Sequence, residues 1–471
     1  MANPVFIGVG GTGQTVLAAY LRLAELAGFT PAPFYIVDSD RLGPLSGSVT
    51  KLKSRLKRTV GGEMAHRWII DPFPTADVER RTFGSLFGNL TGERRELFNC
   101  LFSEDAEFTQ IRAGMYGRPS IGATSIRYKL LKNDDDLKEM KNTLRGGEKH
   151  IILVGSCFGG TGSGGVPMLA NEFAKLNEQE GYSLKIDAMT FLPWFRLVLP
   201  PGEMRTEDKS LHDRLNENFE PNAAAGIFYF KDKIRDYIDT LIIIGVKDPG
   251  MIHRISNEAN QEEAVHILNL FAAILIQNHF TDHLNPPKGI AGNWYEEEEG
   301  IIPKSFTIRR DDNSEPISLL NVIKRTAVKR EWLEKLIKFF ENYGQIHRLH
   351  KPVFLNVALQ KLKGPIKTEA QVRGEIVEHL GKLQESVNEG FKWLEDMEDD
   401  IFFPLSPGDK KVQAEDYESK LSDPLPVIKK WCDHEELPGQ FVDKDFQAPE
   451  VFCEKLTNLF FDNLLIKEFR L

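Results

Sequence analysis

The sequence predicts an α/β protein in which a parallel sheet with helices on both faces is followed by a largely helical C-terminal region. Three observations lead to this prediction. Apolar strand-like segments and periodic helix-like segments alternate from Val5 to about Val246. Two glycine-rich turns each stand between such a strand and such a helix. After Tyr295 the alternation stops, and long charged segments with helical periodicity take its place.

The first glycine turn follows the N-terminal strand. Pro4 to Ile7 has the apolar character of a short buried strand, residues 8–13 spell GVGGTG, and Thr15 to Ala27 has helical periodicity. This order fits the dinucleotide-binding pattern GxGxxG. Asp38, at the end of the apolar strand 34–37, supplies the acidic residue expected after that pattern. The sequence therefore predicts a Rossmann-like nucleotide-binding domain.

The second glycine turn lies in Ile151 to Gly165, IILVGSCFGGTGSGG, and a helix-like stretch at 166–176 follows it. Glycine accepts positive φ and lets a ligand approach the backbone. The free N–H groups of a helix that begins after such a turn favour an anion. Thr161 and Ser163 add hydroxyl donors. The alternative is a tightly packed glycine turn, but two such turns together predict that both bind one nucleotide from different sides. Neither turn contains the lysine of GxxxxGK[ST], which argues against a standard P-loop NTPase.

These turns resemble those of a known family. Residues 159–164, GGTGSG, resemble the signature loop of the tubulin/FtsZ superfamily, and residues 6–13 resemble the opening loop of FtsZ in their GVGG core. Residues 37–40 stand where the family has its second nucleotide loop, and residues 117–122 resemble the third loop. Over Val5 to Phe280 the chain therefore resembles a divergent prokaryotic member of this superfamily.

The resemblance implies a binding site for GTP or GDP with Mg²⁺. Arg118 would neutralise charge on the γ-phosphate, since a guanidinium binds phosphate oxygens in pairs. Asp38 or Asp40 would meet the magnesium ion or its water shell, with Asp40 as the metal residue. Asn260, or else Asn257, would contact the purine. The remaining implied contacts are to the α- and β-phosphates, from Gly10, Gly11, Thr12, Gly13 and Gln14, and to the β- and γ-phosphates, from Gly159, Gly160, Thr161, Gly162, Ser163 and Gly164.

The predicted central helix, Ala259 to Phe280, bears on hydrolysis. After this helix the family carries an Asn-x-Asp-x-x-Asp motif that completes the hydrolytic site of the neighbouring subunit. Residues 277–282 of this chain read QNHFTD and lack the middle acid. Asp282 is the catalytic candidate that remains, acting on a water that attacks the γ-phosphate in line. The resemblance thus implies head-to-tail filaments with GTPase activity, and it leaves open a nucleotide-binding scaffold with little or no hydrolysis.

A rival interpretation is a ThiF-like adenylating enzyme that uses ATP. The opening of such enzymes also combines GxGGxG with a strand that ends in Asp-x-Asp, as in residues 8–13 and Asp38 to Asp40. Those enzymes usually add paired CxxC zinc ligands, which this chain lacks. The second glycine turn has no role in that interpretation, and an NAD(P) dehydrogenase meets the same objection.

Composition restricts the partners. The chain has 471 residues and a net charge of −10, which argues against direct binding of nucleic acid. Cys100, Cys157, Cys432 and Cys453 show no CxxC or Cys/His ligand spacing, so we expect a reducing compartment and no structural zinc. No apolar stretch approaches the roughly 20 residues that cross a bilayer, and no signal peptide precedes Pro4. These features predict a cytoplasmic protein without a membrane partner.

The predicted domain organisation has three parts. Residues 1–254 form the nucleotide-binding domain, 255–284 the central helix with its following loop, and 285–471 a mostly helical C-terminal domain. The proline and glycine residues of Asn285 to Trp294 indicate the boundary. The family's second domain mixes sheet and helix, so a mostly helical one suggests a surface for a protein partner or an adjacent subunit. Its expected elements are a strand at 301–308 and helices at 319–343, 369–393 and 449–469.

Overall fold

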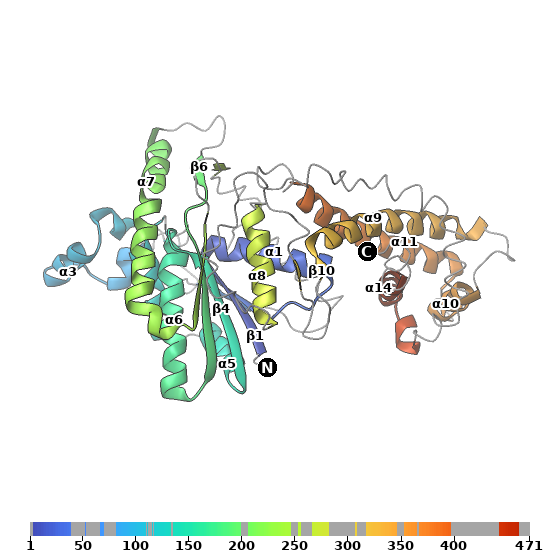
Figure 1. The fold of residues 1–471 in the computed structure, drawn as a ribbon, viewed down its shortest axis with the longest axis horizontal. Helices are drawn as coiled ribbons and strands as arrows, with labels where there is room; N and C mark the ends of the chain where they lie inside the picture. The colour runs from blue at the N-terminus through green and yellow to red at the C-terminus, as the bar shows by residue number, and fades with distance from the viewer. Residues whose placement is uncertain are drawn as a thin grey trace. The chain divides into compact units, whose positions relative to one another are not determined.

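The structure is a computed structural model, in which the chain forms two compact units, Met1–Asn285 and Pro286–Leu471. Figure 1 shows the elements of both units, and each unit is described by itself. The residues that the structure describes are 3–38, 52, 66–69, 82–109, 111, 115, 117–132, 135–198, 206–245, 253–255, 266–281, 307–308, 317–345, 353–364, 367–396 and 442–460.

The first unit is built on a sheet of six described strands in the order β3-β2-β1-β4-β5-β7. All neighbouring strands in it are parallel. The strands are β1 (Asn3–Val9), β2 (Phe34–Asp38), β3 (His66–Ile69), β4 (Glu148–Ser156), β5 (Ser183–Phe191) and β7 (Thr240–Ile244). The central strands β1, β2, β4 and β5 are buried along most of their length, as parallel strands are when helices cover both faces. The predicted Rossmann-like α/β fold is confirmed.

The strand order reverses next to β1. The chain builds outward from β1 through β2 to β3 and then returns to place β4 on the other side of β1. In the register of this pair, Gly8 lies opposite Val154, so the carboxyl ends of the two strands lie side by side. Open α/β sheets bind their ligands outside the carboxyl ends of the strands at such a reversal. Both glycine turns follow these two strands.

Helices cover both faces of the sheet (Figure 1). One face packs against α4 (Pro119–Lys132), α5 (Asp135–Leu144) and α6 (Gly160–Glu180), in a core that includes alternate residues of β1 and β4. On the other face α1 (Gly10–Ala27) packs against α8 (Ile267–Phe280). Because both faces are covered, the carboxyl edge of the strands is where a ligand can reach the backbone.

Smaller elements surround this framework. The 3₁₀ helices η2 (Phe83–Phe87) and η3 (Glu104–Phe108) and the helix α3 (Glu93–Leu101) pack around a cluster of aromatic rings. The long helix α7 continues into two short turns, and a separate short strand pair is parallel. These elements are α7 (Thr206–Tyr229), η5 (Phe230–Ile234), η6 (Arg235–Tyr237), β6 (Arg196–Val198) and β8 (His253–Ile255).

The second unit is largely helical in its described residues, as predicted. Its core joins the buried faces of its helices, with Trp332, Phe340, Leu380 and Phe452 among the residues with no more than traces of exposure. Two short antiparallel strands precede the first helix. The elements are β9 (Thr307–Ile308), β10 (Ile317–Ser318), α9 (Leu319–Asn342), η9 (Tyr343–Gln345), α10 (Val353–Lys363), α11 (Glu369–Asp396), η12 (Asp443–Phe446) and α14 (Pro449–Phe460).

Three helix starts differ from the predicted ones. Helices α1 and α6 begin at Gly10 and Gly160, so both glycine segments form first turns of helices and not loops. The central helix α8 begins at Ile267, whereas the predicted helix spans 259–280 and its first residues lie outside the described part of the chain. His266 sets this start, because its backbone is extended and its Nδ1 accepts a hydrogen bond from the Leu268 N–H at 3.1 Å. Among the described helices, none combines the length and the apolar character that a membrane span requires.

Candidate functional site

The two glycine turns are in direct contact at the reversal of strand order. A Cβ atom at Gly10 would lie 3.1 Å from both the Gly162 nitrogen and the Thr161 Cβ. The φ of Gly10 is +69°, a conformation that favours glycine. A Cβ at Gly155 would lie 3.2 Å from the Val9 carbonyl oxygen. The backbone of the first glycine turn thus approaches that of the second so closely that a side chain at Gly10 or Gly155 would obstruct it. This agrees with the sequence prediction that both turns face one site.

Both helices that leave these turns have uncapped N-termini. Neither α1 nor α6 has a side-chain cap hydrogen bond, and neither has an acidic residue in its first turn. The first-turn N–H groups of a helix have no partner within the helix. In α1 and α6 these include the N–H groups of residues 10–12 and 160–162. Two such ends meeting at one place favour an anion by their N–H groups and their dipoles.

The glycines of the two turns divide into packed and open positions. A Cβ at Gly13 would lie 2.5 Å from the Val154 carbonyl oxygen. At Gly160 it would lie 2.3 Å from the Met115 Cβ, and at Gly164 it would lie 2.3 Å from the Ala123 nitrogen. A side chain at any of these three positions would clash with β4, Met115 or α4, so close packing requires glycine there. Gly11 differs, because it is exposed and a Cβ there would meet no atom within 4 Å.

Polar side chains of the site form hydrogen bonds within it, to a neighbouring side chain or to the backbone. The Gln14 side-chain amide donates a hydrogen bond to the Asp38 carboxylate, which is buried at the end of β2. The Thr15 hydroxyl donates to the Gly11 carbonyl at 2.9 Å. The Ser163 hydroxyl donates to the Gly159 carbonyl. Thr12 and Thr161 are buried in the same first turns. The structure thus brings the Gln14 amide and the Asp38 carboxylate together beside the N-terminus of α1.

Arg118 is held beside the site by two neighbours. Its Nη2 forms an ion pair with the Asp105 carboxylate, and its Nη1 donates to the Thr109 hydroxyl at 2.8 Å. A hydrogen bond from Ser103 lowers the pKa of Asp105, burial opposes this shift, and the ion pair with Arg118 adds to it. To contact a phosphate, Arg118 would have to exchange these partners.

The third predicted loop is partly helical, because α4 begins at Pro119. A Cβ at Gly122 would lie 2.2 Å from the Gly160 carbonyl oxygen, so α4 packs directly on the first turn of α6.

Asn222 of α7 strengthens the junction between α4 and α6, and the sequence did not predict this role of Asn222. Its side-chain amide donates to the Gly117 carbonyl at 2.8 Å and to the Phe158 carbonyl at 3.3 Å. No pattern around Asn222 indicates this role.

The two residues before the second glycine run support the turn from inside. Phe158 is buried against Phe219 with ring centroids 4.8 Å apart. The Cys157 thiol is buried and donates to the Phe191 carbonyl at 3.1 Å. Burial raises the pKa of Cys157 to about 11, so the thiol is neutral near pH 7. Cys157 is a packing residue.

Three of the predicted site residues, Asp40, Asn260 and Asp282, lie outside the described residues, as does Asn257. The structure therefore bears on the two glycine turns, Gln14, Asp38 and Arg118.

The strand order and the turns at its reversal define a Rossmann-like α/β domain.

No protein-family model and no curated protein matches the sequence. Among solved structures, the chain is similar to three CetZ proteins, each at 15% identity. They are CetZ2 from Haloferax volcanii as a GTPγS-bound protofilament (59% of this chain, 59% of that one, TM-score 0.29), CetZ1 from Haloferax volcanii as a GDP-bound monomer (52%, 51%, 0.28) and CetZ from Methanosaeta thermophila (62%, 56%, 0.31). The chain thus spans less than two thirds of the length of each.

Proposed function

We propose that this chain is a tubulin/FtsZ-like GTP-binding protein that self-associates head to tail and completes GTP hydrolysis at the subunit interface. The observation that carries the proposal is the contact between Gly10 and the pair Thr161 and Gly162. This contact joins two uncapped helix N-termini at the reversal of strand order. A ThiF-like enzyme or a dehydrogenase uses only the first of the two glycine turns, and so accounts for half of this site.

The residues present fit a phosphate chain. The first-turn N–H groups of α1 and α6 would bind phosphate oxygens, and the open position at Gly11 gives those oxygens access to the backbone. Gly10 would keep the two helix starts close enough to share one ligand, while Gly13 and Gly164 let α1 approach β4 and α6 approach α4. Backbone contacts from Gln14 and Ser163 are less favourable, because N–H groups beyond the first turn are bonded within the helix.

The acidic residue at the end of β2 fits the magnesium ion of a nucleotide complex. Mg²⁺ prefers oxygen ligands and keeps several waters. Asp38 supplies carboxylate oxygens beside α1, and Gln14 orients them through its hydrogen bond. Asp40 is the second acid proposed to reach the ion. When bound, the ion would supply charge neutralisation between the phosphates.

Hydrolysis is proposed to need a second subunit. Asp282 of one chain would orient the attacking water in the site of the next, and Arg118 would exchange Asp105 for the γ-phosphate. Each site would then be complete only in an assembly. Activity should therefore rise more steeply than protein concentration.

A specific observation favours a second candidate, a nucleotide-binding scaffold with weak or no hydrolysis. His279 occupies the position of the middle acid of the family motif, and it is buried with its Nε2 2.6 Å from the Asp187 Oδ2. Gln277 is also buried, and its Oε1 accepts from the Tyr20 hydroxyl at 3.1 Å. Neither side chain can serve a neighbouring subunit from these positions. Asp282 is the single acid left in the motif.

Phosphate release from GTP and from ATP, measured across a series of protein concentrations with sedimentation of the same samples, tests the proposal. GTP turnover that rises more than linearly and accompanies pelleting supports the polymerising GTPase. GTP binding and pelleting without turnover support the scaffold. ATP consumption with release of pyrophosphate refutes both in favour of an adenylating enzyme.

The proposal extends to partners and location. We expect the second unit to bind a protein partner or an adjacent subunit, and the net charge of −10 makes nucleic acid an unfavourable ligand. A cytoplasmic location without membrane binding fits a protein whose nucleotide, GTP, is abundant there. Co-sedimentation with DNA or vesicles should show no binding above background.

A further inference from the structure

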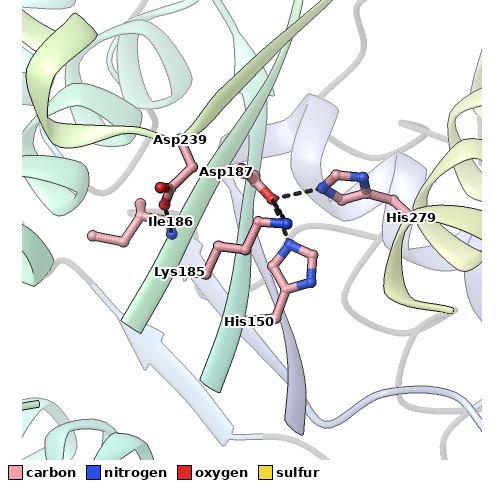
Figure 2. A network of polar contacts seen from close by, with 6 residues as sticks. All are labelled: His150, Lys185, Ile186, Asp187, Asp239 and His279. Atoms are coloured by element: carbon pink, nitrogen blue, oxygen red, sulfur yellow. Dashed lines mark hydrogen bonds and ion pairs between the residues drawn. The ribbon is translucent and has the colours of Figure 1, made fainter. Parts of the chain in front are cut away.

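Three buried polar side chains meet at the end of the sheet away from the glycine turns. His150 lies near the start of β4, Asp187 lies in β5, and His279 lies in the last turn of α8. Their side chains are 5%, 0% and 7% exposed. Figure 2 shows the two imidazole rings directed at the same carboxylate. Three separate elements thus contribute one cluster.

The register of the sheet explains why these side chains meet. Ile152 pairs with Asp187 and His150 pairs with Lys185, so His150 and Asp187 share one face of the sheet. Helix α8 covers this face and runs antiparallel to the strands. His266 at its start packs against Trp194, which follows β5, with ring centroids 4.6 Å apart. The last turn of α8 therefore lies at the amino ends of the strands, beside His150.

The ligand chemistry of the cluster is that of a transition metal. The His150 and His279 Nε2 atoms and an Asp187 carboxylate oxygen all lie within 4.8 Å of one another. The other carboxylate oxygen, Oδ1, is buried and has no hydrogen-bond partner among the described residues. A buried polar atom without a partner is costly, and a cation beside it removes that cost. Two imidazoles and a carboxylate are ligands of Zn²⁺ and related ions, whereas Mg²⁺ takes oxygen ligands.

We propose that His150, Asp187 and His279 form a binding site for a divalent transition metal of the zinc class, distinct from the nucleotide magnesium. Tetrahedral bonds of about 2.0–2.1 Å place ligand atoms about 3.3 Å apart. The His279 Nε2 lies 2.6 Å from the Asp187 Oδ2, so the ring needs to move by less than about 1 Å to admit the ion. The bound ion would fasten α8 to β4 and β5.

Lys185 is the charged neighbour that a metal must displace. Its Nζ lies 3.9 Å from the Asp187 Oδ2, and its side chain is 39% exposed (Figure 2). A lysine with this much exposure can turn to solvent when a cation takes its place. Asp239, also in Figure 2, accepts a hydrogen bond from the Ile186 N–H at 2.8 Å and does not join the cluster. In the proposed site, an ion would approach Asp187 from the side of the partly exposed Lys185.

The sequence does not reveal this site. Asp187 is 37 residues from His150 and 92 residues from His279, far from any spacing of a zinc motif. The expectation of no structural zinc rested on the cysteines, and the proposed site contains none of them. Only the sheet register and the placement of α8 bring the three ligands together.

The test uses the full-length protein without nucleotide and compares the wild type with Asp187→Asn and His150→Gln. Asparagine keeps the size of the side chain without its charge, and glutamine keeps a hydrogen-bond donor without an imidazole. His379→Gln is the control, because His379 lies in α11 and pairs with Glu450 at 3.0 Å. The readouts are zinc content by mass spectrometry, the visible spectrum with Co²⁺, and the Tm with and without EDTA.

The expected result is about one zinc per chain, a tetrahedral Co²⁺ spectrum, and a Tm that EDTA lowers and Zn²⁺, but not Mg²⁺, restores. Each cluster variant should bind Co²⁺ at least about tenfold more weakly, while the control binds as the wild type does. A wild type that retains no zinc, shows no Co²⁺ spectrum and keeps its Tm in EDTA overturns the proposal. The cluster is then a hydrogen-bonded network only. Variants that are folded by circular dichroism and bind Co²⁺ as tightly as the wild type overturn it as well.

Discussion

A substitution at Gly11 can test ligand binding without disturbing the packing of the protein. A Cβ there meets no protein atom within 4 Å, so Gly11→Ala should leave the free energy of unfolding unchanged or raise it by up to about 1 kcal/mol. The same methyl group would occupy the proposed path of the phosphates, and we expect GTP binding to weaken at least about tenfold, as measured by calorimetry.

Gly374 of α11 provides the matched control for this prediction. It is also helical and also has no atom within 4 Å of an added Cβ, but it lies in the second unit. Gly374→Ala should therefore be equally well tolerated and should leave GTP affinity unchanged. Equal GTP affinity in Gly11→Ala and the wild type would contradict the placement of the phosphates.

His266 makes a pH-dependent contribution to stability. Burial lowers its pKa from 6.5 to about 4, and its neutral Nδ1 accepts the Leu268 N–H. Between about pH 6.5 and pH 4 the unfolded chain binds a proton at this ring and the folded chain does not. The contribution of His266 is therefore complete above pH 6.5 and is lost as the pH falls, by up to about 3 kcal/mol.

His266→Asn isolates this effect, because asparagine can also cap a helix and does not titrate. The difference in free energy of unfolding between wild type and variant, measured by urea denaturation at several pH values, should shrink or reverse below pH 6.5. A difference that is constant from pH 7.5 to pH 4.5 would show that the ring titrates normally in the folded protein.

At the scale of elements, α1 and α8 are joined by a hydroxyl group. The Tyr20 hydroxyl donates to the Gln277 Oε1 at 3.1 Å and accepts from the Ala32 N–H at 3.0 Å. Tyr20→Phe removes this acceptor from a buried N–H, so we expect a loss of about 1–3 kcal/mol in the free energy of unfolding of the first unit. Tyr229→Phe, at an exposed residue, is the control and should change it by less than about 0.5 kcal/mol.

The elements also show what the sequence alone can predict. Local periodicity was sufficient for strands β1, β2, β4, β5 and β7, for α9 and α11, and for the order strand, glycine turn, helix, but it did not predict β3. It was insufficient for the helix starts at Gly10 and Gly160, because a run of glycines carries no periodicity, and the residues that pack against them, such as Thr161 and Met115, are adjacent only in the folded chain. Asn222 and the cluster around Asp187 were missed for the same reason. Their partners are distant in the sequence and adjacent only in the folded sheet.

At the scale of the whole molecule, a head-to-tail assembly predicts complementation. Each hydrolytic site would combine the glycine turns of one chain with Asp282 of the next, in a heterologous contact. At a GTP concentration well below the Kd of the Gly11→Ala variant, Gly11→Ala and Asp282→Ala chains should each show little turnover alone. An equal mixture should recover about a quarter of the wild-type GTP turnover, because about a quarter of random contacts pair two intact halves.

The control for complementation is a mixture of Asp282→Ala chains with a Gly11→Ala, Asp282→Ala double variant, which contains no intact acid. This mixture should remain inactive at every concentration. Turnover by Asp282→Ala alone at the wild-type rate would contradict the role of Asp282 as the acid that one chain supplies to the next.

Helix α8 has a mechanical consequence. Its 14 residues extend for about 21 Å, from His266 beside the carboxyl edge of the sheet to His279 beside the amino edge. A helix resists compression along its axis, since each of its turns is hydrogen-bonded to the next. A force along the axis at one end of α8 is therefore transmitted to its other end. Helix α8 therefore links the two edges of the first unit through one continuously hydrogen-bonded element.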